Sequence, residues 1–207
     1  MSSEYEALQA RLVAAGAPAS ASKGPLGFTG PIEILVNTPH SAGPYEGLLV
    51  EAIPSLSGNE LEMVVRALSE RGMNRAGPIL ATLMASDTSR STPGLLWAIG
   101  NALNTINDPR TYPAVLGLCA DDRLGTGRQM LFAMLPRIRS EAAYRCALAG
   151  LKDPSVRGHA IEAVGKFGRV EALTQLEGLE TKAGLYEHKA KTTAIRRLKR
   201  AAEGRAR

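Results

Sequence analysis

The side chains that most often bind metals or act as nucleophiles are few in this sequence and lie far apart. Its three histidines are His40, His159 and His188, and none belongs to an HExxH motif or has a cysteine at the spacing of a metal site. No Gly-x-Ser-x-Gly elbow occurs, and no Ser, His and Asp lie in contexts typical of a catalytic triad. The sequence therefore predicts no metal, no cofactor and no enzymatic activity.

The two cysteines are the remaining candidates for chemistry. Cys119 and Cys146 are well separated in the sequence, lie in apolar surroundings and form no CxxC motif. Reduced thiols buried in the core are the expected state, and a zinc site or a disulfide are the alternatives.

Two pairs of opposite charges stand near turns and could be imagined as substrate-binding groups. They are Asp122 with Arg128, and Asp153 with Arg157. We expect instead that they are structural and hold neighbouring elements together.

Capping boxes at helix starts are predicted for Ser57 with Glu60 and for Thr126 with Gln129, from their i, i+3 spacing.

The elements that position these residues are predicted to be helices. Of the 207 residues, 44% are hydrophobic but only 4% are aromatic, so Ala, Leu, Val and Ile dominate the apolar content. This composition favours closely packed helices over an aromatic-rich sandwich. No stretch reaches the roughly 18 apolar residues of a membrane span, and no signal peptide is recognised. The sequence thus predicts an all-α protein of the cytoplasm that does not enter membranes.

The N-terminal part, residues 1–56, has an irregular pattern. Residues 4–15 form an apolar helical stripe, and residues 44–54 form a second one. Between them, residues 16–31 are rich in Gly, Pro, Ala and Ser and are expected to be a linker anchored by Leu26 and Phe28.

From residue 57 the chain repeats a pattern of helix, short turn and helix. Four apolar side chains of one copy, Ala160, Ala163, Val164 and Phe167, match Leu131, Met134, Leu135 and Ile138 at a constant offset along the chain. Asp87, Asp122 and Asp153 close successive copies at similar intervals. A period of this length is typical of solenoids, in which each copy buries its apolar faces against its neighbours.

The best copy, DPSVRGHAIEAVGKFGRVEALTQL, resembles the short bacterial form of the HEAT repeat in its turn Asp, its Val-Arg pair, its Ala-rich first helix ending in Gly, and its second helix with leucines. The copy before it lacks the turn Gly. The resemblance implies a right-handed α-solenoid of antiparallel helix pairs over residues 57–184, with residues 1–56 and 185–207 as helical caps. It also implies that second helices line a concave face.

Side chains that would point outward on those concave helices are candidates for binding a partner. They are Arg110, Tyr112, Arg145, Thr174 and Gln175. Trp97, the only tryptophan, is expected to pack in the core beside Ile99 and Leu103. The resemblance therefore favours an adaptor or scaffold that holds another protein.

The C-terminal segment carries the excess positive charge. Residues 182–207 have nine Lys or Arg and two Glu, a net charge of +7, so residues 1–181 sum to −2 within the total of +5. Tyr186, Ala190, Ala194, Leu198 and Ala201 form one apolar stripe of a predicted helix. Its other faces carry the basic residues Lys189, Arg196, Arg197, Lys199 and Arg200.

Two alternatives to the adaptor remain open. The basic helix could bind nucleic acid through phosphate groups without reading sequence. HEAT-like DNA glycosylases do so on a basic concave face, whereas the repeats here are net acidic. A lyase or hydroxylase subunit with short HEAT repeats is the other alternative, although the ligands for its metal or cofactor are not recognised.

Overall fold

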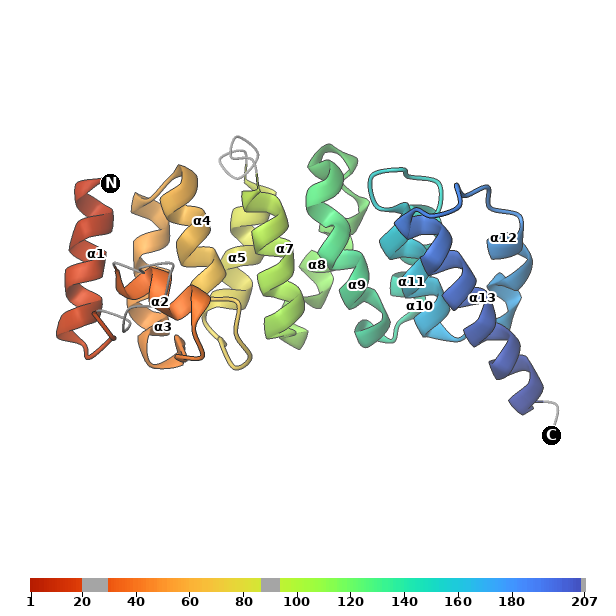
Figure 1. Cartoon of the computed structure of the whole chain (residues 1–207), viewed down its shortest axis with the longest axis horizontal. Coiled ribbons are helices and arrows are strands. Elements are labelled where there is room, and N and C mark those ends of the chain that lie inside the picture. Colours follow the sequence, from red (N-terminus) through yellow and green to blue (C-terminus); the bar gives the residue numbers. More distant parts are fainter. Residues whose placement is uncertain (20–29, 87–93, 206–207) are drawn as a thin grey trace. The chain divides into compact units, whose positions relative to one another are not determined.

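The computed structural model describes residues 1–19, 30–86 and 94–205, and within these ranges the chain forms helices and turns without a strand (Figure 1). The predicted all-α class is confirmed. No helix in the described ranges is both long enough and apolar enough to cross a membrane. Leu26, Phe28 and Asp87, which carried predictions above, lie outside the described residues.

The first of two compact units spans Met1–Thr111 and arranges its helices in two rows. Within each row every helix packs on the next. One row consists of α2 (Pro31–Asn37), α4 (Gly58–Ala67) and α7 (Leu95–Ile106). The other consists of α1 (Ser3–Ala14), α3 (Glu46–Ala52) and α5 (Ala76–Ala85), followed by the 3₁₀ turn η3 (Pro109–Thr111). The 3₁₀ turns η1 (Gly43–Tyr45) and η2 (Ile53–Ser55) flank α3, so the predicted helix at 44–54 is present with 3₁₀ ends.

The second unit, Tyr112–Arg207, has the same two-row arrangement. In one row α11 packs between α9 and α13, and in the other α8 packs on α10. Those helices are α8 (Tyr112–Ala120), α9 (Gln129–Ile138), α10 (Glu141–Gly150), α11 (Arg157–Phe167) and α13 (Tyr186–Arg205). A 3₁₀ segment, η4 (Asp122–Arg128), precedes α9, and η5 (Val170–Ala172) leads into α12 (Leu173–Glu177), which packs on α13.

Residues at matching positions of α9 and α11 are buried to a similar degree. Leu131, Met134 and Leu135 are buried in α9, and their counterparts in α11 are also buried; these are Ala160, Ala163 and Val164. The fourth pair, Ile138 and Phe167, is partly exposed in both helices. The repeated apolar frame therefore describes how each helix faces the core.

The ends of these helices also share a backbone conformation. The residues that follow α7, α9 and α11 are Asn107, Arg139 and Gly168, with φ values of 54°, 52° and 69°. All three lie in the left-handed region, which glycine adopts most readily. The glycine missing from the copy before the best one is thus replaced by Arg139 in the same geometry.

Arg128 ties the start of α9 to the turn before α11. Its side chain is 5% exposed, forms an ion pair with Asp153 and donates from Nη1 to the carbonyl oxygen of Cys119 at 2.8 Å. Ser155 also donates from its backbone N–H to Asp153 Oδ1 at 2.8 Å. Burial alone would raise the pKa of Asp153, but the hydrogen bonds from Ser155 and Arg128 hold it below its usual value.

Arg128, Asp153 and Arg157 contact neighbouring elements, as the expected structural role requires, but their partners are not the nearest opposite charges in the sequence. Arg128 pairs with Asp153, whereas Asp122 is exposed. Arg157 donates from Nε to the carbonyl oxygen of Leu151 at 3.1 Å and lies 3.7 Å from the carboxylate of Glu187. In both cases the partner lies on a neighbouring element rather than on the nearest residue.

Both predicted capping boxes are wrong. Ser57 precedes α4 without a side-chain hydrogen bond to the helix start, and the carboxylate of Glu60 instead accepts from Ser2 N and Ser2 Oγ, both at 2.6 Å. These bonds lower the pKa of Glu60 and bind α4 to the start of α1. Gln129 Nε2 donates to the carbonyl oxygen of Ser155 at 2.9 Å.

The last helix, α13, packs its predicted apolar stripe against α11 at Ala190, Ala194 and Leu198, which are buried. Tyr186 departs from the stripe because it is 46% exposed, although its hydroxyl donates to Glu162 at 3.0 Å. Gly165 of α11 lies directly beneath Ala194, where a Cβ on residue 165 would stand 2.6 Å from the Ala194 Cβ. The two helices therefore approach more closely at this point than larger side chains would permit.

Candidate interaction surfaces

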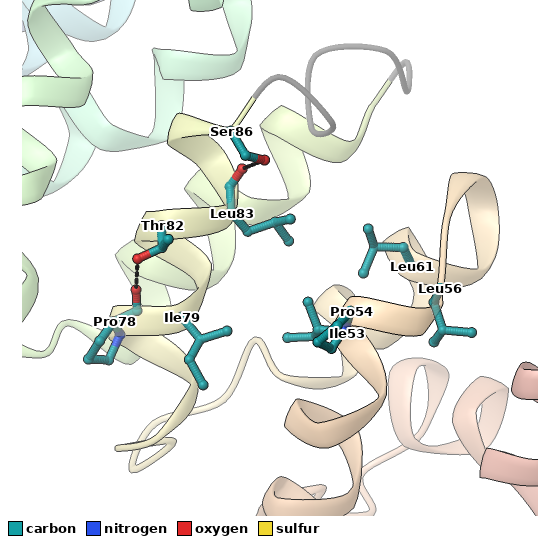
Figure 2. Close-up of a pocket in the computed structure, with 9 residues that line it drawn as sticks. All are labelled: Ile53, Pro54, Leu56, Leu61, Pro78, Ile79, Thr82, Leu83 and Ser86. Carbon is teal, nitrogen blue, oxygen red and sulfur yellow. Dashed lines mark hydrogen bonds between the residues drawn. The ribbon is translucent and has the colours of Figure 1, made fainter.

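A groove of about 470 Å³ lies in the first unit between η2, α4 and α5 (Figure 2). Among the residues that the structure describes, no charged side chain lines it. The lining residues are Ile53, Pro54, Leu56, Leu61, Pro78, Ile79, Thr82, Leu83 and Ser86. An apolar concavity of this kind is where binding of an apolar ligand or protein segment is expected.

The polar groups at the α5 side of the groove hydrogen-bond within their own helix. Thr82 Oγ1 donates to the carbonyl oxygen of Pro78 at 3.1 Å, and Ser86 Oγ donates to that of Leu83 at 2.7 Å (Figure 2). Ile79, which also lines the groove from α5, is 37% exposed. The groove therefore offers aliphatic surface to a ligand.

The composition of α5 explains why this surface exists. Residues 76–85 include no charged side chain. Leu80, Ala81 and Met84 are buried, and α5 packs on α7, so Ile79 and Leu83 remain on another side of the helix. Sequence reasoning did not select these groove residues. The signal was a helix that is apolar around its whole circumference, which indicates a second contact surface.

The predicted partner-binding residues fall in both units. Arg110 lies in η3 of the first unit, whereas the other four lie in the second unit: Tyr112 on α8, Arg145 on α10, and Thr174 and Gln175 on α12. Arg145, Thr174 and Gln175 are exposed and Tyr112 is partly exposed. Their role as one binding strip stays a prediction.

Arg110 has a structural contact that the sequence did not reveal. Its Nε and Nη2 donate to Asp108 Oδ2 at 2.9 and 2.6 Å, and Nη2 also donates to the carbonyl oxygen of Asn74. The hydrogen bonds from Arg110 lower the pKa of Asp108, whose side chain is nearly buried. The guanidinium therefore joins the end of α7 to the turn before α5.

The basic residues of α13 form a second candidate surface. Lys189, Arg196, Arg197, Lys199 and Arg200 are all exposed. Lys199 pairs with Glu177 at 2.9 Å, and in the described part of the chain the other four form no ion pair. Arg196, Lys199 and Arg200 border one shallow hollow. Their charge is therefore largely available to an anion.

Trp97 is not packed in the core, so that prediction is wrong. Its ring is 38% exposed, with the guanidinium carbon of Arg66 6.0 Å from the ring centre.

Across residues 1–19, 30–86 and 94–205, no three His, Cys, Asp or Glu side chains come together as a set that could hold a metal ion.

No family model matches the chain, and neither the curated proteins nor the solved structures contain a match to it. Its function therefore has to follow from its own surfaces.

Proposed function

We propose that this chain is a non-enzymatic adaptor or scaffold, a bacterial cytoplasmic module that binds another protein. In this proposal its helical hairpins stack as a right-handed HEAT-like solenoid capped by residues 1–56 and 185–207. The paired rows of helices in each unit and the recurring frame of α9 and α11 support the stacking. The observation that carries the function is the uncharged groove of the first unit.

The chemistry of the groove indicates the kind of partner segment. Its walls are aliphatic side chains and prolines, and its two hydroxyls hydrogen-bond to backbone carbonyls of α5. A segment that inserts aliphatic side chains, such as one face of an amphipathic helix, would bury apolar area without leaving a charge unpaired. We therefore assign the groove to an apolar helical segment of a partner protein.

A photo-crosslinking amino acid placed at position 79 is expected to capture that partner from an extract of the native host, and position 82 should capture the same protein. Ile79→Glu is then expected to weaken binding of the purified partner by roughly tenfold to a hundredfold, about 1.4 to 2.8 kcal/mol, because a carboxylate must be buried in an apolar contact. Titration calorimetry measures this loss.

Val13→Glu is the matched control, because Val13 is 43% exposed on α1 and does not line the groove. It introduces the same charge at a similar exposed apolar site. Equal binding by both variants, with unchanged melting temperatures, would show that the groove does not hold the partner.

A second function, binding to nucleic acid, is favoured by one observation. Lys189, Arg196, Arg197 and Arg200 of α13 are exposed and form no ion pair among the described residues. When such side chains contact phosphates, the counterions condensed on the nucleic acid are released. This release supplies affinity without sequence preference. The site in this proposal is the exposed side of α13 that carries these residues; Lys189 and Arg197 border a hollow shared with Glu162 and Lys166 of α11.

Duplex DNA is expected to bind the purified protein at about 50 mM salt and to dissociate steeply as salt rises. Replacing Arg196, Arg197, Lys199 and Arg200 with Gln should abolish this binding, and four lost phosphate contacts would reduce the slope of log K against log salt by about 3 to 4. Fluorescence anisotropy over a salt series measures both quantities.

A second quadruple variant controls for net charge. Replacing Arg71, Arg75, Arg137 and Lys152 with Gln removes the same charge from exposed positions outside α13. If both variants lose affinity equally, the basic helix is no specific surface and α13 acts only as a cap.

A further inference from the structure

A cavity of about 510 Å³ in the second unit contains both cysteines of the chain. It lies between α8 and α10 beside the start of α9. Charged or polar groups on its walls come from four places: Cys119 of α8, Arg128 of η4, Arg145 and Cys146 of α10, and Asp153 of the following turn. The rest of the lining is Leu, Ala, Gly and Phe. The two thiols thus share one concave site beside two guanidinium groups.

The two cysteines differ in accessibility. Cys119 is 2% exposed, whereas Cys146 is partly exposed, and both are free thiols. Their side chains line the same cavity from α8 and α10, which pack on each other, although the two residues are distant in the sequence. A small molecule that enters the cavity therefore meets Cys146 more readily than Cys119.

We propose that Cys119 and Cys146 form a redox-active thiol pair, in which Cys146 reacts with a hydroperoxide and Cys119 then closes a disulfide. This modification site is independent of the proposed adaptor function. It rests on the cavity that both thiols line, the packing of α8 on α10 and the unequal exposure of the two side chains.

The electrostatic environment assigns the same roles to the two thiols. The hydrogen bond with Cys119 lowers the pKa of Cys146 despite partial burial, and the positive charge of Arg128 lowers it further. The same hydrogen bond, together with burial, raises the pKa of Cys119 well above its ordinary value. Cys146 therefore ionises more readily than Cys119, and the thiolate is the form that attacks peroxides.

The other contacts of Arg128 fix the position of its guanidinium group beside the cavity. It pairs with Asp153 and donates to the Cys119 carbonyl oxygen at 2.8 Å, so its position relative to α8 is set by the fold. Arg145 is exposed at the same cavity and adds a second positive charge, whereas Asp153 faces Arg128. The net charge on the cavity walls is thus positive before any thiol ionises, which favours the thiolate.

The reaction balances with the hydroperoxide as the only oxidant. The Cys146 thiolate attacks one peroxide oxygen, the O–O bond breaks, and the alkoxide leaves and takes a proton from water, giving a sulfenic acid and an alcohol. Cys119 then loses its proton and attacks the Cys146 sulfur, the S–O bond breaks, and the hydroxide that leaves combines with that proton as water. Two thiols are oxidised to one disulfide while the peroxide is reduced.

Hydrogen peroxide added to the reduced full-length protein is expected to remove two hydrogen atoms from its mass, and peptide mapping should find Cys119 joined to Cys146. In Cys119→Ser the reaction should stop at a sulfenic acid on Cys146, which dimedone traps. In Cys146→Ser the remaining thiol should stay unmodified. The wild-type measurement needs no variant, and unfolding the protein in urea should abolish the rate advantage of Cys146 over a free thiol.

Alkylation by iodoacetamide over a pH series tests the roles of the two thiols. Cys119→Ser retains a hydrogen-bond donor to Cys146, whereas Cys119→Ala removes it. The alkylation midpoint of Cys146 should therefore rise in Cys119→Ala relative to Cys119→Ser, with each pKa unit changing the thiolate fraction about tenfold. Circular dichroism checks that both variants stay folded.

Three outcomes would overturn the proposal. One is a wild-type Cys146 that reacts with peroxide no faster than a free thiol. A second is a sulfenic acid trapped at Cys119 rather than Cys146. The third is oxidation of Cys146 to a sulfinic acid in the wild-type protein with no disulfide formed at low peroxide.

Discussion

Replacing Arg128 with Ala is expected to lower the free energy of unfolding by about 3 kcal/mol, because it leaves the Asp153 carboxylate without its cation and the Cys119 carbonyl oxygen without its donor. Asp153→Ala is expected to cost about 1 to 3 kcal/mol, since the guanidinium of Arg128 stays buried without a counter-charge. The double variant should be less destabilised than the two single losses together, because both act on one contact. Urea denaturation measures all three.

Arg123 and Asp121 provide the control for this double-mutant cycle. They also form an ion pair at 2.8 Å, but the Arg123 side chain is 69% exposed. Arg123→Ala should change the free energy of unfolding by less than about 1 kcal/mol. If Arg128→Ala has an equally small effect, Arg128 does not hold the second unit together.

Gly165→Ala is expected to lower the free energy of unfolding by about 2 kcal/mol, because the added methyl would meet backbone as well as side chain. A Cβ at residue 165 would lie 2.6 Å from the Ala194 Cβ and 2.8 Å from its Cα. No rotamer change can remove a contact with a Cα atom, so α13 must move away from α11. Faster tryptic cleavage within α13, together with a lower urea midpoint, would report this displacement.

Gly117→Ala is the matched control in the same unit. Gly117 lies in α8, is exposed, and a Cβ there would meet nothing within 4 Å. The substitution should raise the free energy of unfolding by about 0.5 to 1 kcal/mol, the usual gain when Ala replaces Gly in a helix. If both substitutions stabilise the protein, the close approach of α11 and α13 is not a tight constraint.

Periodicity predicted the helices well because it depends on the chain's own local geometry. The stripe of α13 shows this, since Ala190, Ala194 and Leu198 are buried as their spacing indicated. The frame shared by α9 and α11 shows it as well. In contrast, α2 has only seven residues and follows a Gly- and Pro-rich segment, too little sequence for a helical period to be recognised.

The partners of polar groups could not be predicted because they depend on which elements become neighbours. Glu60 had the spacing of a capping residue, yet it binds Ser2, 58 residues away. Arg128 was expected to have a structural role, but its spacing did not reveal that its partner is Asp153. A local motif competes with every group that the fold brings close, and sequence spacing carries no information about those groups.

The groove and the thiol cavity were missed for a related reason. Each is bounded by elements from separate parts of the chain: η2, α4 and α5 for the groove, and α8, η4 and α10 for the cavity. Cys119 and Cys146 were each expected to be buried and reduced, and only the packing of α8 on α10 brings them to one cavity.

The left-handed residue after α9 bears on how much the sequence at the end of such a helix can vary. Arg139 adopts the conformation that Gly168 adopts at the equivalent place after α11, at an intrinsic cost of about 1 kcal/mol for a side chain with a Cβ. That penalty is small beside the burial of four large side chains in α9, Leu131, Phe132, Met134 and Leu135, each contributing roughly 1.5 to 3 kcal/mol. A helical hairpin of this kind can therefore end in a residue other than glycine and keep the same backbone path.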